Sequence, residues 1–484
     1  MRHFTYRSLE EIQEAARSVG AIHVIFEPKA ERIKQLLGRK VRVGGFTVGN
    51  SLAIHPMEGC DGTPEGTPGE LTWRRYERFA RGGAKLIWFE ATAVREDGVA
   101  NPRQLRLGRH NVPEFARLLE RVRRLHREVW GRDDDLLEVL QLTHSGRHSY
   151  PRPVVARHDP LLDGKTGIPP DYPLISDGEL ERLEDDFVAA ARLAVEAGFR
   201  AVDIKATHGY LVSELLGAKR RGGAYGGPLE NRCRLLANVA GKIRAALGAR
   251  LLLAMRLGCY EGLPYRRDPQ TGRGVPLPYP VPYAHGFGMD CADPLREDLG
   301  EVEQAVGWFQ QWGFKLLNVS LGSPYLNPHI GRPFEKPDEG NYEQPEHPLL
   351  GVDRHFRIAG RLQARFPALP MVGTGYSWLQ HYAVNAAAFN IAAGRITFLG
   401  MGRNALAYPD FARDALERGE LEPNRVCKTV SFCTYLMRRK NHPLGQFPTG
   451  CVPFDKEVYG PIMKQARETA RAAASQQADP VGGI

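Results

Sequence analysis

The sequence predicts an α/β fold: a (β/α)₈ TIM barrel with a short N-terminal segment and a C-terminal extension. Three observations favour this fold. Eight short apolar runs recur between residues 52 and 400, amphipathic helical stretches separate them, and polar residues follow most of the runs. Several runs are apolar without alternation, which is typical of parallel strands that are covered by helices. Strand and helix alternating eight times is the pattern of a closed parallel barrel.

The predicted strands are, in chain order, residues 52–56, 86–92, 136–144, 201–208, 251–258, 316–322, 370–375 and 396–400. Stretches such as 180–198 and 231–248 have the apolar periodicity of helices that cover a sheet. A doubly wound open sheet uses the same alternation. However, no glycine-rich dinucleotide fingerprint follows the first strand, and polar residues follow many strands instead of one crevice. The barrel is therefore the prediction.

Three regions are predicted along the chain. Residues 1–40 form a helical lead-in, 41–417 the barrel, and 418–484 an extension that contains three cysteines and is expected to end in disorder. The segment 260–300 is rich in Pro, Gly and Tyr and too long for an ordinary loop. We expect it to overhang the active face of the barrel, where long loops usually shape substrates.

Composition excludes several classes of function. The 484 residues are 42% hydrophobic and have a net charge of +9, with arginines scattered among acidic residues. This pattern indicates a solvated surface and favours anionic small molecules over nucleic acid as partners. No stretch resembles a signal peptide or approaches the roughly 20 apolar residues of a membrane span. We expect a cytoplasmic protein with no membrane or nucleic-acid partner, and seven cysteines are too sparse for a disulfide scaffold.

Polar side chains gather where the predicted strands end. The carboxyl ends of parallel barrel strands meet at one face, so these groups are expected to surround one pocket. Left unpaired in a core, each would cost about 1–3 kcal/mol. The residues are Glu58, Glu90, Gln141, Lys205, His208, Tyr210 and Arg256.

The last two strands add a phosphate signal. VGTGYS (372–377) and FLGMGR (398–403) each end a strand in a glycine turn, at the usual phosphate site of this barrel. Each turn alone is also compatible with an ordinary helix entry, but together they predict a phosphate-bearing ligand. Flavin mononucleotide (FMN) fits this set, since Gln141 can pair with its pyrimidine edge and Arg256 can lie near N1–C2=O. The phosphate-binding residues expected are Gly373, Gly375, Gly402 and Arg403.

Four motifs resemble the old yellow enzyme family of NAD(P)H:flavin oxidoreductases, over roughly residues 40–415. They are residues 28–59, ending in HPMEG; QLTHSGR (141–147); residues 208–235, which contain the specific run YGGPLENR; and FLGMGRNALAYPDF (398–411). The resemblance implies an FMN-binding TIM barrel. In that family NADH or NADPH first reduces the flavin, and the flavin then passes hydride from N5 to an activated C=C bond of a small molecule.

The resemblance also implies roles for individual residues. Gln141 and Arg256 contact the flavin ring, Gly375, Gly402 and Arg403 hold its phosphate, and Pro56 and Met57 line the ring, with Glu58 or Gly59 near N5 and C4=O. Lys205 and His208 anchor the electron-withdrawing oxygen of the substrate, and Tyr210 donates the proton. These assignments agree with physical expectation. A donor pair stabilises the charge that develops on the oxygen, and a positioned phenol is a general acid. His208 and Tyr210 are two residues apart, so extended backbone would point both the same way.

The chain departs from the family at three places. Many members have a histidine at the position of Lys205. In this chain, Lys205 either forms a structural ion pair with Asp203 or Glu90 or helps to hold an anionic substrate. Glu58 replaces a small residue; it either lowers the flavin redox potential or points away into a salt bridge. In the tail, Val430 stands where an iron–sulfur motif would place its middle cysteine. The three cysteines of the tail are Cys427, Cys433 and Cys451. They are predicted to be buried free thiols and not ligands of an iron–sulfur cluster, and no metal site is predicted.

Two other functions use the same residues. One is a Schiff-base aldolase with Lys205 as its nucleophile, and the other is a non-catalytic flavin- or ligand-binding barrel. The aldolase requires none of Gln141, Arg256 and Tyr210, and only the altered substrate pair supports the binding barrel. The flavin oxidoreductase is therefore favoured. The sequence leaves open the choice between NADH and NADPH, the direction of reaction, the substrate, and assembly into a homo-oligomer.

Overall fold

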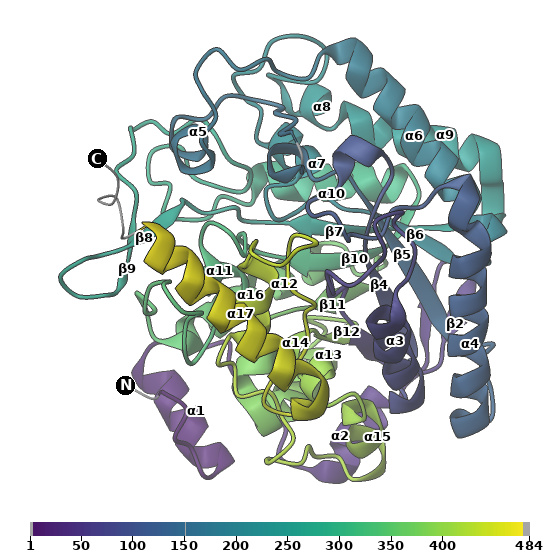
Figure 1. The fold of residues 1–484 in the computed structure, drawn as a ribbon. Coiled ribbons are helices and arrows are strands. Elements are labelled where there is room, and N and C mark those ends of the chain that lie inside the picture. Colours follow the sequence, from purple (N-terminus) through teal and green to yellow (C-terminus); the bar gives the residue numbers. More distant parts are fainter. Residues whose placement is uncertain (1–2, 151, 478–484) are drawn as a thin grey trace.

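The computed structural model describes residues 3–150 and 152–477, and its architecture confirms the predicted barrel (Figure 1). Eight parallel strands close on themselves, and each contains part of one predicted apolar run. In chain order they are β3 (Leu52–Ile54), β4 (Leu86–Ala93), β5 (Leu137–Thr143), β6 (Ala201–Ile204), β7 (Leu252–Gly258), β10 (Phe314–Ser320), β11 (Met371–Gly373) and β12 (Phe398–Met401).

The barrel interior is filled with apolar side chains, with the largest on β4. Trp88 belongs to one buried cluster with small side chains such as Ala53, Ala201 and Ala254. A two-stranded hairpin, β1 (Val41–Val43) and β2 (Phe46–Val48), contributes Val41, Val43 and Val48 to this cluster. With its interior filled, the barrel leaves room for a ligand only at its mouth.

Helices cover the outside of the barrel, and α3 packs against α4 and α6 against α9. The long ones are α3 (Glu70–Gly82), α4 (Val112–Trp130), α6 (Asp177–Glu196), α9 (Arg234–Leu247), α10 (Gly300–Gln311), α12 (Pro348–Arg365) and α13 (Ala383–Ala392). Short helices lie mostly in the loops: α5 (Pro160–Thr166), α7 (Leu211–Leu216), α8 (Leu229–Arg232), α11 (Pro328–Gly331), α14 (Arg403–Ala407) and α15 (Phe411–Glu417). Local sequence can fix where a helix begins. At the long helix α6, Ser176 and Glu179 form a capping box.

The two ends of the chain are helical. The first forty residues contain α1 (Leu9–Ser18) and α2 (Ala30–Leu37), and α2 packs against α13 and α15. The C-terminal extension contains α16 (Phe432–Arg438) and α17 (Lys456–Gln477), which pack on each other. Of the end that is expected to be disordered, residues 475–477 belong to α17 and residues 478–484 lie outside the described residues.

The long segment after β7 forms a hairpin of β8 (Tyr265–Arg267) and β9 (Gly274–Pro276).

Among the described residues, no helix combines the length and the apolar character that a membrane crossing requires.

Candidate active site

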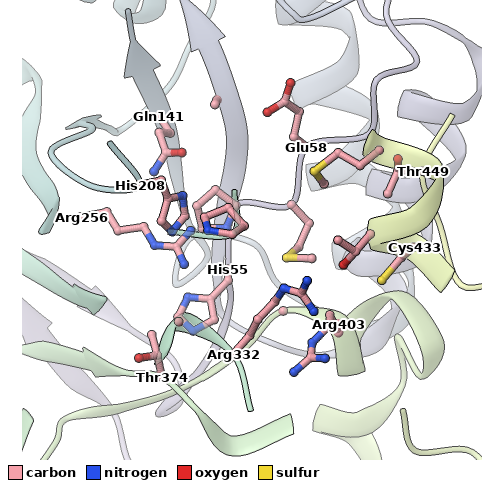
Figure 2. Close-up of a pocket in the computed structure, with 18 of the residues that line it drawn as sticks. His55, Glu58, Gln141, His208, Arg256, Arg332, Thr374, Arg403, Cys433 and Thr449 are labelled. Carbon is pink, nitrogen blue, oxygen red and sulfur yellow. The ribbon is translucent and has the colours of Figure 1, made fainter. Parts of the chain in front are cut away.

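A cavity opens at the carboxyl ends of the barrel strands and encloses about 1210 Å³, including its solvent-open part (Figure 2). Of the residues that the sequence analysis places in the site, eleven line its wall. They are Pro56, Met57, Glu58, Gln141, Lys205, His208, Tyr210, Arg256, Gly375, Gly402 and Arg403.

Gly373, which the sequence analysis also places in the phosphate site, does not line the cavity. It is the last residue of β11, and a Cβ there would contact Ile396 and Tyr376 in the barrel wall. Thr374 and Gly375, one and two residues later, reach the cavity instead. Gly375 has φ +91°, a conformation that favours glycine and turns the chain toward α13.

One side of the cavity is organised by the buried carboxylate of Asp203. Its Oδ2 accepts a 2.5 Å hydrogen bond from Gln141 Nε2 and one of 2.9 Å from Trp88 Nε1, and its Oδ1 accepts from the backbone N–H of Arg256 at 2.6 Å. Burial raises the pKa of Asp203 to about 6, although these hydrogen bonds oppose the shift. Asp203 therefore fixes the orientation of the Gln141 amide beside the Arg256 guanidinium.

Arg256 is a half-buried cation with a buried, unsatisfied donor. Its Nε has no hydrogen-bond partner among the described residues, and burial lowers the pKa of its guanidinium to about 10. An unpaired buried donor is costly, so this position suits an acceptor from a bound ligand.

The chain turns sharply after β6. His208 and Gly209 have φ +68° and +72°, so the expectation of extended backbone between His208 and Tyr210 is wrong. The turn is held by Ser323, whose hydroxyl donates to the carbonyl of His208 at 3.2 Å. Both side chains still line the cavity, but the turn brings them there. Burial, then the charges of Arg256 and Lys205, hold the pKa of His208 well below its usual range, so its ring is neutral.

Lys205 makes no ion pair with Asp203 or Glu90 among the described residues, so a structural salt bridge does not explain it. Its Nζ instead lies 3.3 Å from the centre of the Tyr210 ring. Burial lowers the pKa of Lys205 to about 7, although the carboxylate of Glu58 opposes the shift. Lys205 is therefore a buried amine that changes charge near neutral pH.

Glu58 forms no ion pair within 4 Å in the described part of the chain. Its Oε1 accepts a 2.6 Å hydrogen bond from Asn101 Nδ2, and in Figure 2 its carboxylate points away from Arg332 and Arg403. Burial raises the pKa of this carboxyl, and the cation of Lys205 lowers it in part. A salt bridge is one of the alternatives that the sequence leaves for Glu58. The partner of its carboxylate is instead the uncharged amide of Asn101.

Tyr210 is buried, and its hydroxyl lies 3.2 Å from that of Tyr325. Burial raises the pKa of Tyr210 well above 10, so the phenol keeps its proton. Tyr325 stacks on His148 at 4.5 Å between ring centroids and was missed in the sequence because it lies in the loop after β10.

His55 is a second residue that sequence reasoning missed. It directly follows β3 and is buried at the cavity wall: its Nδ1 accepts from Asn318 Nδ2 at 3.1 Å, and its ring packs against Gly400 so closely that a Cβ there would lie 2.3 Å away. Burial, then Arg256, hold the pKa of His55 well below its usual range. A histidine inside the apolar run LAIHP was the available signal.

The C-terminal extension forms one wall of the cavity. Five of its residues line it: Cys433, Thr434, Met437, Arg438 and Thr449. None of the residues 260–300 lines this cavity, so a role of this segment in shaping the substrate stays a prediction. Local sequence patterns predict strands and helices but not which distant segments pack together. The contact between the extension and the barrel mouth therefore could not be predicted.

The three cysteines of the extension lie around one small pocket next to Arg403 and are free. Burial raises the pKa of the Cys427 and Cys451 thiols, which keeps them protonated. Within the described ranges, no set of three His, Cys, Asp or Glu side chains could hold a metal ion.

A buried ion triad holds the chain next to the segment Pro56–Glu58 of the cavity wall. Arg75 donates to Asp61 at 2.6 Å and to Glu90 at 2.5 Å, and Glu90 also accepts from the backbone N–H of Gly59 at 2.8 Å. Burial raises the pKa of Glu90 to about 7 against the effect of Arg75. The triad fixes the chain just after Pro56 and Met57.

The residues present fit FMN. The glycine turns at 375 and 402 lie beside Arg403, whose buried Nη1 has no hydrogen-bond partner among the described residues and suits a phosphate. At the other end, the oriented Gln141 amide and the unsatisfied Arg256 suit the pyrimidine edge of a flavin. Between them, Pro56 and Met57 supply apolar surface.

Comparison with known proteins agrees with this fit. A family model described as the NADH:flavin oxidoreductase / NADH oxidase family matches residues 39–268. The chain is 31% identical to an NADPH dehydrogenase of Listeria welshimeri over 285 residues, 54% of this chain and 80% of that protein. It is 28% identical to an NADPH dehydrogenase of Halalkalibacterium halodurans over 288 residues, 55% and 81% of the respective chains.

Two solved structures share the fold. An old yellow enzyme homologue from Zymomonas mobilis matches with a TM-score of 0.56 and 21% identity, covering 81% of this chain and 96% of that one. 2-Naphthoyl-CoA reductase matches with a TM-score of 0.62 and 17% identity, covering 83% of this chain and 55% of that one. The present chain therefore spans about half the length of the latter protein.

Proposed function

The chain belongs to the NADH:flavin oxidoreductase / NADH oxidase family, the family of old yellow enzyme, and from this premise we propose that it reduces an activated C=C bond. It is an oxidoreductase that uses FMN and NAD(P)H. Neither an aldolase nor a non-catalytic barrel is needed to account for its residues. The proposed substrate is a small alkene that is conjugated to a carbonyl group.

The observation that supports this reaction best is the arrangement of Tyr210, His208 and Lys205 at one cavity wall. A protonated phenol, a neutral imidazole and an amine that titrates near pH 7 face the same space. The imidazole and the amine can donate to a carbonyl oxygen, and the phenol can donate to carbon. Such a division of roles suits the addition of hydride and a proton across a conjugated double bond.

The binding of the cofactor is assigned to residues on three sides. Arg403 and the glycine turns would hold the phosphate, Gln141 and Arg256 the pyrimidine edge, and the Pro56–Met57 segment one face of the ring. FMN when bound supplies the hydride. Arg256 would stabilise negative charge at the pyrimidine edge because its guanidinium lines the cavity and has a buried, unpaired Nε.

The substrate is activated and protonated by the chain itself. His208 Nε2 lies 3.4 Å from Ser320 Oγ, which fixes the imidazole, and with Lys205 it would bind the carbonyl oxygen as charge develops there. Tyr210 would then protonate the α-carbon, since its high pKa keeps the hydroxyl proton available. Because the site is largely buried, these donors act with little competition from water.

A turnover assay without oxygen tests this proposal. We expect NAD(P)H to be oxidised when cyclohex-2-enone is present and the saturated ketone to accumulate in equal amount. Cyclohexanone, which has the carbonyl but no alkene, is the matched control and should support no turnover. Oxidation of NAD(P)H that yields no saturated ketone from the enone would contradict the proposal.

Lys205 makes the reaction pH-dependent. A lysine with a lowered pKa of about 7 is protonated below that value and neutral above it, so the cation beside the carbonyl oxygen is lost as the pH rises through about 7. We expect the reoxidation of the reduced holoenzyme by an enone to slow over this step. Lys205→Met should be slow at both ends and remove the step, whereas Lys205→Arg should remain charged and move it to higher pH.

Stopped-flow measurement on either side of pH 7 checks this. A wild-type step that persists unchanged in Lys205→Met would assign the titration to another group, such as Glu58.

A further inference from the structure

Three arginines gather where the C-terminal extension meets the cavity. Arg403 begins α14, Arg332 directly follows α11, and Arg438 ends α16. All three line the cavity, and in Figure 2 the labelled Arg332 and Arg403 lie close together. Burial, then the charges of Arg403 and Arg438, lower the pKa of Arg332 to about 9. The three guanidiniums therefore act on one another as a single cationic cluster.

One carboxylate is shared within this cluster. Asp338 lies 3.1 Å from Arg438 Nη1 and 3.8 Å from Arg332 Nη2. Arg403 donates instead to the backbone carbonyl of Pro333 at 2.7 Å, and in the described part of the chain it has no carboxylate partner. The cluster thus has two more positive charges than negative ones.

Each arginine also keeps one donor unused. Arg332 Nη2, Arg403 Nη1 and Arg438 Nη2 are buried atoms without a hydrogen-bond partner among the described residues. The side chains of Arg332 and Arg438 are still 16% and 21% exposed, so a ligand in the cavity can reach them. Buried donors without acceptors are rare in proteins and call for an explanation, which an anionic ligand would supply.

The members of the cluster have different neighbours. Arg403 lies next to the glycine turns and is assigned above to the cofactor phosphate. Arg332 and Arg438 line the same cavity as Tyr325, whose hydroxyl lies 3.2 Å from that of Tyr210. Arg332, Arg438 and Asp338 together have a net charge of +1, which matches one monoanion.

We propose that Arg332 and Arg438 form a second anion subsite, which binds a carboxylate group of the substrate while its alkene lies beside Tyr210. The inference rests on the proposed function and names the substrate class: conjugated alkenes with an additional carboxylate. A guanidinium fork matches the two oxygens of a carboxylate, and the pair comes from two separate segments that only the fold brings together.

Equilibrium binding to the FMN-loaded enzyme tests the subsite without turnover. The probes are benzoate and its uncharged counterpart benzamide, measured by isothermal titration calorimetry. We expect benzoate to bind about tenfold more tightly than benzamide, since an ionised group strengthens each hydrogen bond. Arg332→Gln and Arg438→Gln should lose this preference, and Arg438→Lys should keep part of it.

Arg439→Gln is the matched control. Arg439 is the next residue in the chain, stacks 4.4 Å from the centre of the Tyr435 ring and donates to the backbone carbonyl of Glu339. This variant should retain the wild-type preference for benzoate. Loss of the preference in Arg439→Gln as well would indicate general damage to the extension and overturn the assignment.

Two further results would overturn the proposal. One is equal binding of benzoate and benzamide by the wild type. The other result concerns the cofactor. If Arg332→Gln and Arg438→Gln bound FMN more weakly but bound riboflavin and benzoate as the wild type does, both arginines would be assigned to the cofactor phosphate. The binding experiment does not depend on turnover. An enzyme that prefers benzoate but reduces no alkene would contradict the proposed reaction and still support the anion subsite.

Discussion

Tyr210→Phe is expected to slow reoxidation of the reduced enzyme by cyclohex-2-enone by about 10²–10⁴-fold, the usual contribution of a positioned general acid. The substitution removes only the hydroxyl, which lies 3.2 Å from that of Tyr325 and holds its proton at all physiological pH values. Reduction of the enzyme by NAD(P)H should be unchanged, because that step takes no proton from Tyr210. Anaerobic stopped-flow measurement separates the two half-reactions.

The control for this prediction is Tyr225→Phe. Tyr225 is also a buried tyrosine whose hydroxyl has a single partner, Glu184 at 2.6 Å, but it lies among the outer helices. It should affect stability only, with both half-reactions at wild-type rates. If Tyr210→Phe slowed both half-reactions equally, the residue would have a structural role and the proton would come from another group.

Arg75→Met is expected to reduce the free energy of unfolding by about 3–5 kcal/mol, because it leaves two buried carboxylates without their counter-ion. Asp61 and Glu90 both bond to Arg75, and the side chains of all three are 3% exposed or less. Loss of the cation raises the pKa of Glu90 beyond its present value of about 7. The carboxyl is then neutral at low pH, so the destabilisation should be smaller one pH unit below 7 than one unit above it.

Urea unfolding at these two pH values measures the effect, with Arg78→Met as the control. Arg78 lies on the same helix, but its side chain is 31% exposed and its partner is Asp455, so its removal should cost no more than about 1 kcal/mol. A loss below about 1 kcal/mol in Arg75→Met at the higher pH would show that the triad contributes little. Because Glu90 also holds the N–H of Gly59, we expect weaker FMN binding in the same variant.

The barrel was predictable because its signals are local. Each apolar run was found at a strand, and the glycines and polar residues at the strand ends follow from the direction of the chain. The strand limits were less accurate where chemistry overrides the pattern: β6 ends at Ile204, and the predicted run continues to His208. The left-handed turn at His208 depends on a hydrogen bond from Ser323, more than one hundred residues away, which local sequence cannot indicate.

Most of the missed parts of the site are non-local. Tyr325 and Arg332 lie in the loop after β10, and Arg438 comes from the extension, so their meeting depends on the complete fold. The long segment after β7 had a better composition for a substrate loop than the extension, yet it lies outside the cavity wall. His55 is different, because a histidine in an apolar strand was visible in the sequence and was read as part of the run.

The proposed reduction of a conjugated alkene is tested most directly in a single half-reaction. The purified, FMN-loaded enzyme is reduced with one equivalent of NAD(P)H without oxygen and then mixed with one equivalent of cyclohex-2-enone. Our account predicts that the oxidised flavin absorbance returns completely and that one equivalent of cyclohexanone forms. An enzyme that stays reduced, or returns to the oxidised form without a saturated product, would contradict it.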